Sequence, residues 1–295
     1  MQNKIKAAII GPGNIGTDLM YKIFRSDVLE MSVMIGVVES EGIKRARGLG
    51  VETSTEGIQY LVDHPEKADI VFDSTTAKAH IGVNAPACEK MGKIIIDLTP
   101  AAIGKIVTPM VNMEEALSVK NVNLITCGGQ ATTPIIHAIS SVVPLEYAEV
   151  VTAVSSKSAG PGTRNNIDEY TSTTARAIVQ LTNTERAKVM TVFNPAVPEV
   201  PMRNTIFGIP KGAFDLEEVQ RSVIAMAEKI REYVPGYELT LKPVIEHDVI
   251  TTIVTIHGQG DFLPPYAGNL DIETSSAIKI GELYAHDLLK KRGEN

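Results

Sequence analysis

The chain has 295 residues, 44% of them hydrophobic and 21% charged, which excludes a disordered or fibrous protein. At about 150 residues per domain, this length predicts roughly two domains, each large enough for its own hydrophobic core. The net charge of −7 makes most of the surface repel polyanions, so we expect no nucleic-acid partner.

The amino-terminal half alternates short apolar runs with helical patterns. Residues 1–6 contain no apolar leader and no later segment reaches the length of a membrane span, so we expect a cytoplasmic protein without a membrane partner. The expected strands are residues 6–10, 32–39, 69–73, 93–97 and 122–126, and the expected helices are residues 16–26, 58–64 and 84–91. This alternation predicts an α/β domain in which a doubly wound parallel sheet carries helices on its faces.

The carboxyl-terminal half does not show this regular alternation of strands and helices. Its expected strands are residues 147–156, 189–193, 204–209, 238–246 and 248–257, and its expected helices are residues 167–181, 215–234 and 271–291. Asp215 is the expected N-cap of the second of these helices, with Glu218 completing a capping box. Strands and helices without strict alternation predict an α+β domain. The Gly/Pro-rich loop 258–268 is the expected crossing back to the first domain.

A G-x-G-x-x-G motif lies between the first predicted strand and the first predicted helix. Gly11 permits the tight turn, Gly13 lets the backbone approach a pyrophosphate, and Gly16 lets the helix pack closely on the strand. The helix N-terminus then offers N–H groups to phosphates. The motif in this context predicts a nicotinamide dinucleotide site, and a purely structural turn is the alternative.

An acidic residue closes the second predicted strand. Glu39 at this position can accept a hydrogen bond from a ribose 2′-hydroxyl and would repel a 2′-phosphate, which favours NAD over NADP. A solvated strand-end carboxylate is the alternative. Arg45 and Arg47 lie close enough in sequence to weaken the exclusion of NADP.

Two cysteines are too few for a disulfide scaffold or a multi-cysteine zinc site, and the six histidines show no metal-ligand spacing, so we expect no metal. The strand before Cys127 is expected to end at Thr126, and the next helix to start near Thr132 with Pro134 in its first turn. Cys127 would then lie in a loop before a helix N-terminus, where the dipole and the backbone amides stabilise a thiolate. The two glycines that follow would admit a substrate and leave N–H groups for an oxyanion.

Cys127 is therefore the expected nucleophile. Cys88 lies in a helical stretch and is interpreted as a small packing residue. A Cys–His pair stays open at this stage, because His80, His137 or His257 could approach Cys127 in space, although each histidine alone is more often structural.

These residues, together with five sequence blocks, resemble one known family, the acylating (CoA-dependent) acetaldehyde dehydrogenases. The resemblance covers most of the chain, and its most specific blocks are residues 13–20, 97–104, 126–132, 155–164 and 266–271. It implies a Rossmann domain formed by residues 1–127 and 268–295. It also implies a catalytic and dimerisation domain formed by residues 128–267, as in glyceraldehyde-phosphate and semialdehyde dehydrogenases.

The resemblance further implies the site residues. It makes Cys127 the nucleophile, and it places NAD contacts on Pro12, Gly13, Asn14 and Ile15, on Ser158, Ala159, Gly160, Pro161, Gly162, Thr163, Arg164, Asn165 and Asn166, and on Asn269. In the middle segment, Gly160-Pro161-Gly162 would form a rigid turn. Lys157 and Arg164 would supply positive charge for the phosphates of NAD or CoA, and a solvated loop is the alternative.

The implied reaction converts acetaldehyde, or another short aldehyde, with CoA and NAD⁺ into acetyl-CoA and NADH. Cys127 would form a thiohemiacetal and, after hydride transfer, an acyl-enzyme thioester that CoA resolves. The family also implies a homodimer or higher homo-oligomer, a 4-hydroxy-2-oxovalerate aldolase as partner, and a place in aromatic hydrocarbon catabolism.

The sequence departs from the family pattern in three places. Pro12 stands where the family usually has Ser, so one backbone N–H is missing from the phosphate turn. Asn204 stands where the family usually has Asp, and an amide cannot be a general base, so that catalytic role is absent, weaker or filled elsewhere. The segment 241–248 is shorter than in typical members. A phosphate-dependent semialdehyde dehydrogenase or reductase and a non-enzymatic NAD-binding sensor are the alternative functions.

Overall fold

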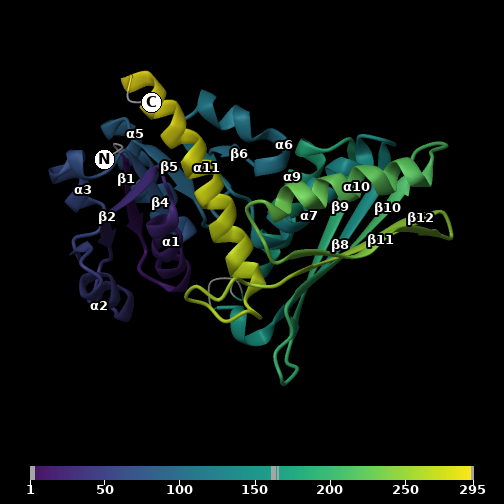
Figure 1. Ribbon diagram of the computed structural model, residues 1–295, viewed down its shortest axis with the longest axis horizontal. Helices are drawn as coiled ribbons and strands as arrows, with labels where there is room; N and C mark the ends of the chain where they lie inside the picture. The colour runs from purple at the N-terminus through teal and green to yellow at the C-terminus, as the bar shows by residue number, and fades with distance from the viewer. Residues whose placement is uncertain (1–3, 161–163, 165, 294–295) are drawn as a thin grey trace. The chain divides into compact units, whose positions relative to one another are not determined.

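The computed structural model describes residues 4–160, 164 and 166–293 (Figure 1). The chain folds into two compact units. Unit 1 contains the described residues among 1–107, 113–124 and 274–295, and unit 2 contains those among 108–112 and 125–273. Across these described residues, no helix is both long and apolar enough to cross a membrane, and no group of three His, Cys, Asp or Glu side chains is placed to hold a metal ion.

A seven-stranded parallel sheet forms the centre of unit 1, which confirms the predicted parallel architecture. In spatial order its strands are β3 (Glu52–Ser54), β2 (Leu29–Ile35), β1 (Ile5–Ile10), β4 (Ile70–Asp73), β5 (Ile94–Asp97), β7 (Asn121–Asn123) and β6 (Lys105–Ile106). The order runs outward from β1 in both directions, as in doubly wound dinucleotide-binding folds. Such folds bind their ligands at the carboxyl ends of the strands.

Both faces of this sheet are buried, because each strand alternates its side chains between two cores. In β1, Ile5, Ala7 and Ile9 enter one core, whereas Ala8 and Ile10 enter the other. The first core is covered by α1 (Asn14–Arg25), α2 (Glu41–Gly48) and the later part of α11 (Gly268–Arg292), and the second by α3 (Gln59–Asp63) and α5 (Ala85–Met91). Short turns complete the unit: η1 (Pro65–Lys67), α4 (Ala77–Ala79), η2 (His80–Asn84) and η3 (Met113–Ser118). Cys88 of α5 is fully buried in the second core, which confirms its packing role.

A five-stranded mixed sheet forms the centre of unit 2. In spatial order its strands are β11 (Tyr237–Glu246), β12 (Val249–Ile256), β10 (Met202–Pro210), β8 (Leu145–Ser155) and β9 (Thr184–Asn194). The first four strands pair antiparallel, whereas β8 and β9 pair parallel because α9 (Ile167–Leu181) joins them as a crossover. The predicted α+β organisation is confirmed.

Helices cover only one face of this second sheet (Figure 1). α7 (Cys127–Ser140), α9, α10 (Leu216–Arg231) and the short α6 (Pro109–Asn112) share a hydrophobic core with alternate residues of β8, namely Ala148, Val150 and Val154. The 3-10 turn η4 (Ser156–Ser158) follows β8. On the outer face, Met190 and Val192 of β9 remain 36% and 47% exposed. That face therefore presents apolar side chains that none of the described elements of unit 2 covers.

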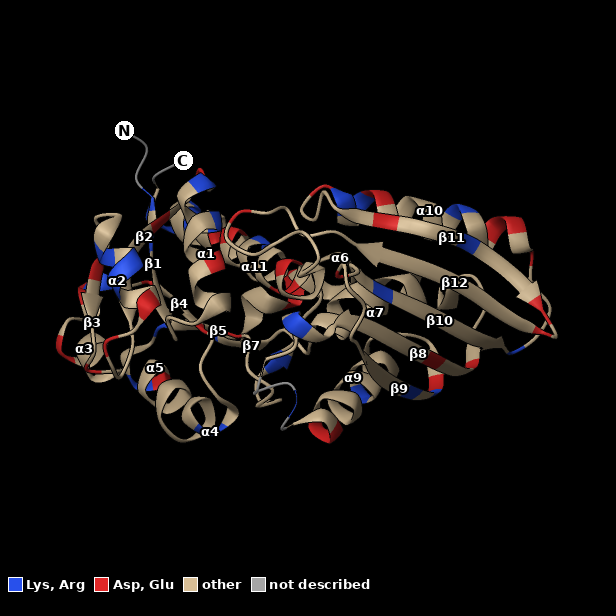
Figure 2. Cartoon of the chain, turned by 90° about the horizontal axis from the view of Figure 1, so that it is seen from below, with Lys and Arg blue, Asp and Glu red and all other residues tan. Residues whose placement is uncertain are grey.

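The α10 helix has the charge distribution that its macrodipole favours. Asp215 is its N-cap, as predicted, and its carboxylate accepts a hydrogen bond from the Glu217 N–H at 2.9 Å. Glu217 and Glu218 lie in the first turn, and Lys229 and Arg231 lie in the last (Figure 2). Negative charge near the N-terminus and positive charge near the C-terminus both stabilise the helix.

The predicted start of the helix after Cys127 is wrong. β7 ends at Asn123, and α7 begins at Cys127 rather than near Thr132. Thr126 provides the N-cap, because its hydroxyl accepts a hydrogen bond from the Gly129 N–H at 2.9 Å. Pro134 consequently lies inside the helix, not in its first turn. The preference of proline for a first turn misled the prediction, whereas the capping threonine marked the true start.

Candidate active site

Cys127 is the first residue of α7, and the backbone that leads to it has an unusual conformation. Ile125 has a φ of 65°, in the left-handed region that β-branched residues rarely adopt. Its side chain is buried, and a Cβ at Gly129 would approach Ile125 Cγ2 to 2.6 Å. A strained conformation of this kind costs about 1–3 kcal/mol and is typical of functional turns. The turn thus fixes Cys127 at the N-terminus of the helix.

The two glycines after Cys127 do not leave their amides available. The Gly128 N–H donates to the Tyr170 hydroxyl at 3.0 Å, and the Gly129 N–H donates to the Thr126 hydroxyl. The interpretation of these amides as an oxyanion site is therefore wrong. Glycine is needed at position 128 for a packing reason, because a Cβ there would lie 2.3 Å from Tyr170 Oη.

The sulfur of Cys127 lies 3.5 Å from the hydroxyl of Tyr170, which projects from α9. Burial and, to a lesser extent, the Glu273 carboxylate together raise the pKa of the Cys127 thiol to about 12. The Tyr170 hydroxyl and the N–H groups of Gly128 and Cys127 lower the pKa, as a helix N-terminus should, but burial outweighs them. Burial at this position therefore opposes the expected stabilisation of the thiolate by the helix N-terminus.

Asn204 lies in the middle of the unit 2 sheet and is fully buried. It faces Thr152 across the β10–β8 ladder, and the Thr152 hydroxyl donates to Asn204 Oδ1 at 2.8 Å. Within the described residues, Nδ2 of Asn204 is buried without a hydrogen-bond partner. Thr152 Oγ1 would also lie 3.1 Å from a Cβ at Gly128, so Asn204 is one side chain removed from the Cys127 turn.

The first turn of α11 contributes two buried polar residues to unit 2. Asn269 Nδ2 donates to the carbonyl of Ser158 at 3.4 Å, so two residues predicted to contact NAD lie side by side. Glu273 follows Asn269 by one helical turn and faces the same way. Asn269 and Glu273 are only 5% exposed, and Glu273 is the carboxylate that acts on the Cys127 thiol.

The segment after β8 holds its positive charges in local contacts. Lys157 forms an ion pair with Glu199. The Arg164 guanidinium donates to the carbonyls of Ser156 and Ala159 at 2.7 and 3.0 Å. The same guanidinium lies 4.6 Å from the centre of the Phe193 ring.

Arg164 is therefore engaged by the carbonyls of its own segment, whereas Lys157 pairs with Glu199 between β9 and β10, and both side chains remain exposed. Gly160 is exposed, and Asn166 lies at the N-cap of α9. Of the other residues predicted to contact NAD here, Pro161, Gly162, Thr163 and Asn165 lie outside the described residues.

In unit 1, the glycine motif has the geometry of a phosphate turn. Gly11 has a φ of 103°, and a Cβ there would lie 2.6 Å from the carbonyl oxygen of Ser74 at the end of β4. A Cβ at Gly16 would lie 2.0 Å from the carbonyl oxygen of Gly11. Gly13 is the exposed N-cap of α1, has no neighbouring atom within 4 Å of a built Cβ, and receives no side-chain cap. The open space in front of an uncapped helix N-terminus fits a pyrophosphate.

The residues beside these glycines are placed by packing. The Pro12 carbonyl would clash with a Cβ at Gly42 of α2, at 2.0 Å, so Pro12 is closely packed against that helix. Asn14 is exposed at the start of α1, and Ile15 is half-buried against the first core. Pro12 has no backbone N–H. The N–H groups offered at the start of α1 are therefore those of the residues that follow it.

Glu39 lies beyond the second strand, because β2 ends at Ile35 and not at residue 39 as predicted. Both carboxylate oxygens accept hydrogen bonds from Arg47, at 2.8 and 3.2 Å, which lowers the pKa of Glu39. Val37 and Val38 precede it and are 77% and 65% exposed. A ribose that binds Glu39 would therefore also meet Arg47. It would lie next to the exposed side chains of Val37 and Val38.

A buried polar cluster that the sequence did not predict joins the ends of β4 and β5. His80 Nδ1 lies 2.9 Å from Asp73 Oδ2, and His80 Nε2 lies 3.5 Å from Asp97 Oδ2. Asp73 also accepts from Thr75, and Asp97 accepts from the Thr99 N–H at 2.7 Å. Burial raises the pKa of Asp97 to about 6, against the opposing effects of the His80 charge and the Thr99 hydrogen bonds. The cluster fixes the loops at the carboxyl edge of the sheet, where dinucleotides bind in this fold.

The histidines left open as partners of Cys127 are engaged elsewhere. His80 belongs to the aspartate cluster of unit 1. His137 Nδ1 lies 3.2 Å from the carbonyl of Leu181, and His257 pairs with Glu238 at 3.4 Å. The geometry therefore assigns none of these three histidines to Cys127.

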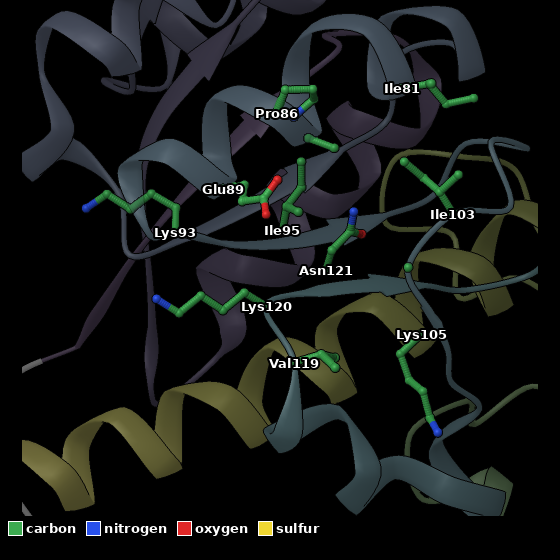
Figure 3. Close-up of a pocket in the computed structure, with 12 residues that line it drawn as sticks. Ile81, Pro86, Glu89, Lys93, Ile95, Ile103, Lys105, Val119, Lys120 and Asn121 are labelled. Carbon is green, nitrogen blue, oxygen red and sulfur yellow. The ribbon is translucent and has the colours of Figure 1, made fainter.

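A separate hollow of about 550 Å³ opens in unit 1, at the amino ends of β5 and β7 (Figure 3). Its walls are mainly apolar, and three lysines lie around it: Lys93, Lys105 and Lys120. Lys120 donates to the Gly92 carbonyl, and Lys105 pairs with Glu115. The hollow lies at the sheet edge opposite to the glycine motif and includes no predicted site residue, so we assign it no part in the reaction.

Comparisons with known proteins agree with this arrangement. A family model described as "Prokaryotic acetaldehyde dehydrogenase, dimerisation" matches residues 127–264. An acetaldehyde dehydrogenase of Bacillus cereus (strain ATCC 10987 / NRS 248) is 50% identical over 295 residues, covering 98% of this chain and 97% of that protein. An acetaldehyde dehydrogenase of Geobacillus stearothermophilus is 48% identical over 282 residues, covering 95% of this chain and 96% of that protein.

The fold also has a close structural counterpart. Aspartate semialdehyde dehydrogenase II from Vibrio cholerae, solved in complex with ASA, superposes with a TM-score of 0.66 at 17% identity, covering 97% of this chain and 99% of that chain. This likeness confirms the semialdehyde dehydrogenase-like fold. Because relatives of about half-identical sequence match nearly the whole length, the chain belongs to the acetaldehyde dehydrogenase family.

Proposed function

We propose that this chain oxidises acetaldehyde, or another short aldehyde, with NAD⁺ and transfers the resulting acyl group to CoA. The full-length similarity to acetaldehyde dehydrogenases supports this reaction. The observation that carries it within the molecule is the position of Cys127, a partly accessible thiol at the N-terminus of α7. Cys88, in contrast, is completely buried and packs in the core.

The proposed chemistry proceeds through a covalent adduct on Cys127. The deprotonated sulfur bonds to the aldehyde carbon, and the carbonyl oxygen becomes an alkoxide. Bound NAD⁺ supplies the hydride acceptor. As the hydride leaves, the alkoxide closes to the carbonyl of a thioester. The thiolate of CoA then attacks that carbonyl, and the bond to Cys127 breaks to release acetyl-CoA.

The residues for NAD are proposed to be those of the sequence analysis. The turn from Gly11 to Ile15 would hold the pyrophosphate at the start of α1, and Glu39 with Arg47 would meet the adenosine ribose. Ser158 and Asn269, which touch each other, are also proposed to contact the cofactor. Asn269 Oδ1 is buried and has no hydrogen-bond partner within the described residues, so it is available to a ligand.

We infer that Asn204 acts as a hydrogen-bond donor rather than as a base. Its Oδ1 already accepts from Thr152, and its buried Nδ2 has no hydrogen-bond partner within the described residues, so the Nδ2 hydrogens are available to a ligand. An amide N–H can stabilise an alkoxide but cannot remove a proton. Replacing Asn204 with Asp should speed acyl transfer to CoA or hydrolysis of the thioester. Unchanged rates of both steps would contradict a catalytic role for the side chain at position 204.

Acceptor choice tests the proposed reaction against its alternatives. NADH formation is measured for a series of short aldehydes with CoA, with phosphate and with neither. The proposal expects turnover that requires CoA. Dependence on phosphate would identify a semialdehyde dehydrogenase instead, and NAD binding without turnover would favour the sensor.

We further propose a homodimer or higher homo-oligomer assembled through unit 2. The matched family model describes dimerisation, and the outer face of the sheet exposes Met190 and Val192. Val192→Asp should therefore lower the molar mass measured by sedimentation, and an unchanged mass would contradict this face as the interface.

The remaining assignments stay proposals. Residues 1–127 with 268–295 would form the NAD domain, and residues 128–267 the catalytic and dimerisation domain. A 4-hydroxy-2-oxovalerate aldolase as partner, a cytoplasmic location and a role in aromatic hydrocarbon catabolism rest on the family resemblance. Co-purification with such an aldolase tests the first of these three.

A further inference from the structure

The hydroxyl of Tyr170 is fixed between the backbone and the sulfur of the active-site turn. It accepts the Gly128 N–H at 3.0 Å and lies 3.5 Å from Cys127 Sγ. Its ring comes from α9 and is buried, with 6% of the residue exposed. A phenol has one proton, and an oxygen that accepts from a backbone amide still has that proton to donate.

A second contact one turn further along α9 locks this arrangement. The Thr174 hydroxyl donates to the Tyr170 carbonyl at 2.7 Å and lies 2.7 Å from the hydroxyl of Thr126, the N-cap of α7. Two side chains of α9, Tyr170 and Thr174, therefore contact the first residues of α7 and its N-cap. The close approach also explains why residue 128 is glycine, because a Cβ there would lie 2.3 Å from Tyr170 Oη.

From this geometry we infer that Tyr170 is a positioning residue that donates its hydroxyl proton to the sulfur of Cys127 and stabilises the thiolate. This inference rests on the proposed role of Cys127 as nucleophile. A hydrogen bond to a charged acceptor is stronger than one to a neutral acceptor, so the contact favours the thiolate over the thiol. Burial keeps the phenol itself neutral by raising the pKa of Tyr170 well above its ordinary value.

Tyr170 offsets the two influences that hold the thiol protonated. These are burial and the charge of Glu273, which lies on α11; the other groups facing the sulfur are the N–H groups at the start of α7. The phenol is a side-chain donor that reaches the sulfur, beside the N–H groups of Gly128 and Cys127.

The rate at which iodoacetamide alkylates Cys127 tests the inference without any turnover. Peptide mass spectrometry follows Cys127 from neutral to alkaline pH in the full chain, with buried Cys88 as an internal reference. Tyr170→Phe keeps the ring and removes the donor, so the alkylation profile should move to higher pH by about one unit or more. The rate below the thiol pKa should fall by about tenfold.

A matched variant separates this effect from general loosening of the helix. Tyr237 is also fully buried, and its hydroxyl donates to the Ala131 carbonyl on the same helix, away from the sulfur. Tyr237→Phe should leave the alkylation profile of Cys127 unchanged. Incorporating 3-fluorotyrosine at position 170, a more acidic donor, should move the profile to lower pH.

Equal profiles for the wild type and Tyr170→Phe, or equal shifts for Tyr170→Phe and Tyr237→Phe, would overturn the inference. Failure of the proposed function looks different. In that case Cys127→Ser would retain CoA-dependent turnover, while the effect of Tyr170 on thiol alkylation could still be measured.

Discussion

The backbone N–H of Gly128 donates to the hydroxyl of Tyr170, and the two residues approach so closely that no Cβ fits between them. Gly128→Ala should therefore displace the phenol or the start of α7. We expect at least a tenfold loss of CoA-dependent turnover and a destabilisation of about 1–3 kcal/mol, typical of overpacking. Steady-state kinetics and thermal unfolding measure the two effects.

A glycine that touches nothing provides the control. Gly48 ends α2, and a Cβ there would meet no atom within 4 Å. Gly48→Ala should leave turnover unchanged and leave stability equal or slightly higher, because alanine is the better helix former. A Gly128→Ala variant as active and as stable as Gly48→Ala would contradict the packing argument.

The carboxylate of Glu273 holds the Cys127 thiol in its protonated form. Because that charge raises the pKa of the thiol, Glu273→Gln should lower the pKa and speed alkylation of Cys127 at neutral pH. The exposed Glu238 provides a comparison, since it pairs with His257 rather than acting on the sulfur, and Glu238→Gln should have no effect. If Glu273→Gln slowed alkylation, the assigned electrostatics would have the wrong sign.

Arg47 is expected to influence the choice between NAD and NADP. Its guanidinium binds both oxygens of Glu39 and would attract a 2′-phosphate. Arg47→Ala should expose the carboxylate alone and raise the ratio of kcat/KM for NAD over NADP several-fold. Lys211→Ala, which breaks an exposed pair with Glu185 in unit 2, should leave the ratio unchanged. A fall in the ratio for Arg47→Ala would count against Glu39 as the ribose contact.

Stability should fall as the pH rises through the range in which the Asp97 cluster titrates. The folded pKa of Asp97 is about 6, above its ordinary value of 3.8, so the folded state binds more protons between these values. The associated loss is about 3 kcal/mol at high pH. The pKa of His80 is raised as well, because its hydrogen bond to Asp73 and the charge of Asp97 outweigh the effect of burial. The stability that His80 contributes is therefore also lost as the pH rises.

The comparison is made between the wild type and Asp97→Asn, which is neutral at every pH. Thermal unfolding is measured at about pH 4 and about pH 7. The Tm of the variant relative to that of the wild type should be higher at the higher pH. A difference in Tm that stays constant with pH would show that Asp97 does not titrate in this range.

Local signals in the sequence were sufficient for most of the fold. The glycine turn after β1 and the capped start of α10 were predictable, because the residues that determine them are neighbours in the chain. The boundary at Cys127 was not, because the proline preference for a first turn and the capping threonine at position 126 indicate different helix starts. The strand before Glu39 was extended too far, since Val37 and Val38 continue the apolar run although both are exposed.

The candidate site shows the same division. Cys127 stands out in the sequence because a cysteine followed by two glycines is unusual. Tyr170 could not be found in this way, since it lies 43 residues further along the chain and reaches the sulfur only after α7 and α9 pack together. Glu273 likewise depends on the return of the chain in α11. Gly128 is a sign of a close contact, but the sequence does not identify the residue that makes this contact.

The central claim is that Cys127 carries the acyl group, and the most direct measurement is the mass of the peptide that contains it. The enzyme is incubated with acetyl-CoA in the absence of NADH, quenched in acid and digested. The account predicts one added acetyl group on the Cys127 peptide, removed by free CoA and absent from Cys127→Ala. An unmodified Cys127 peptide, or an acetyl group found on Cys88 instead, would contradict it.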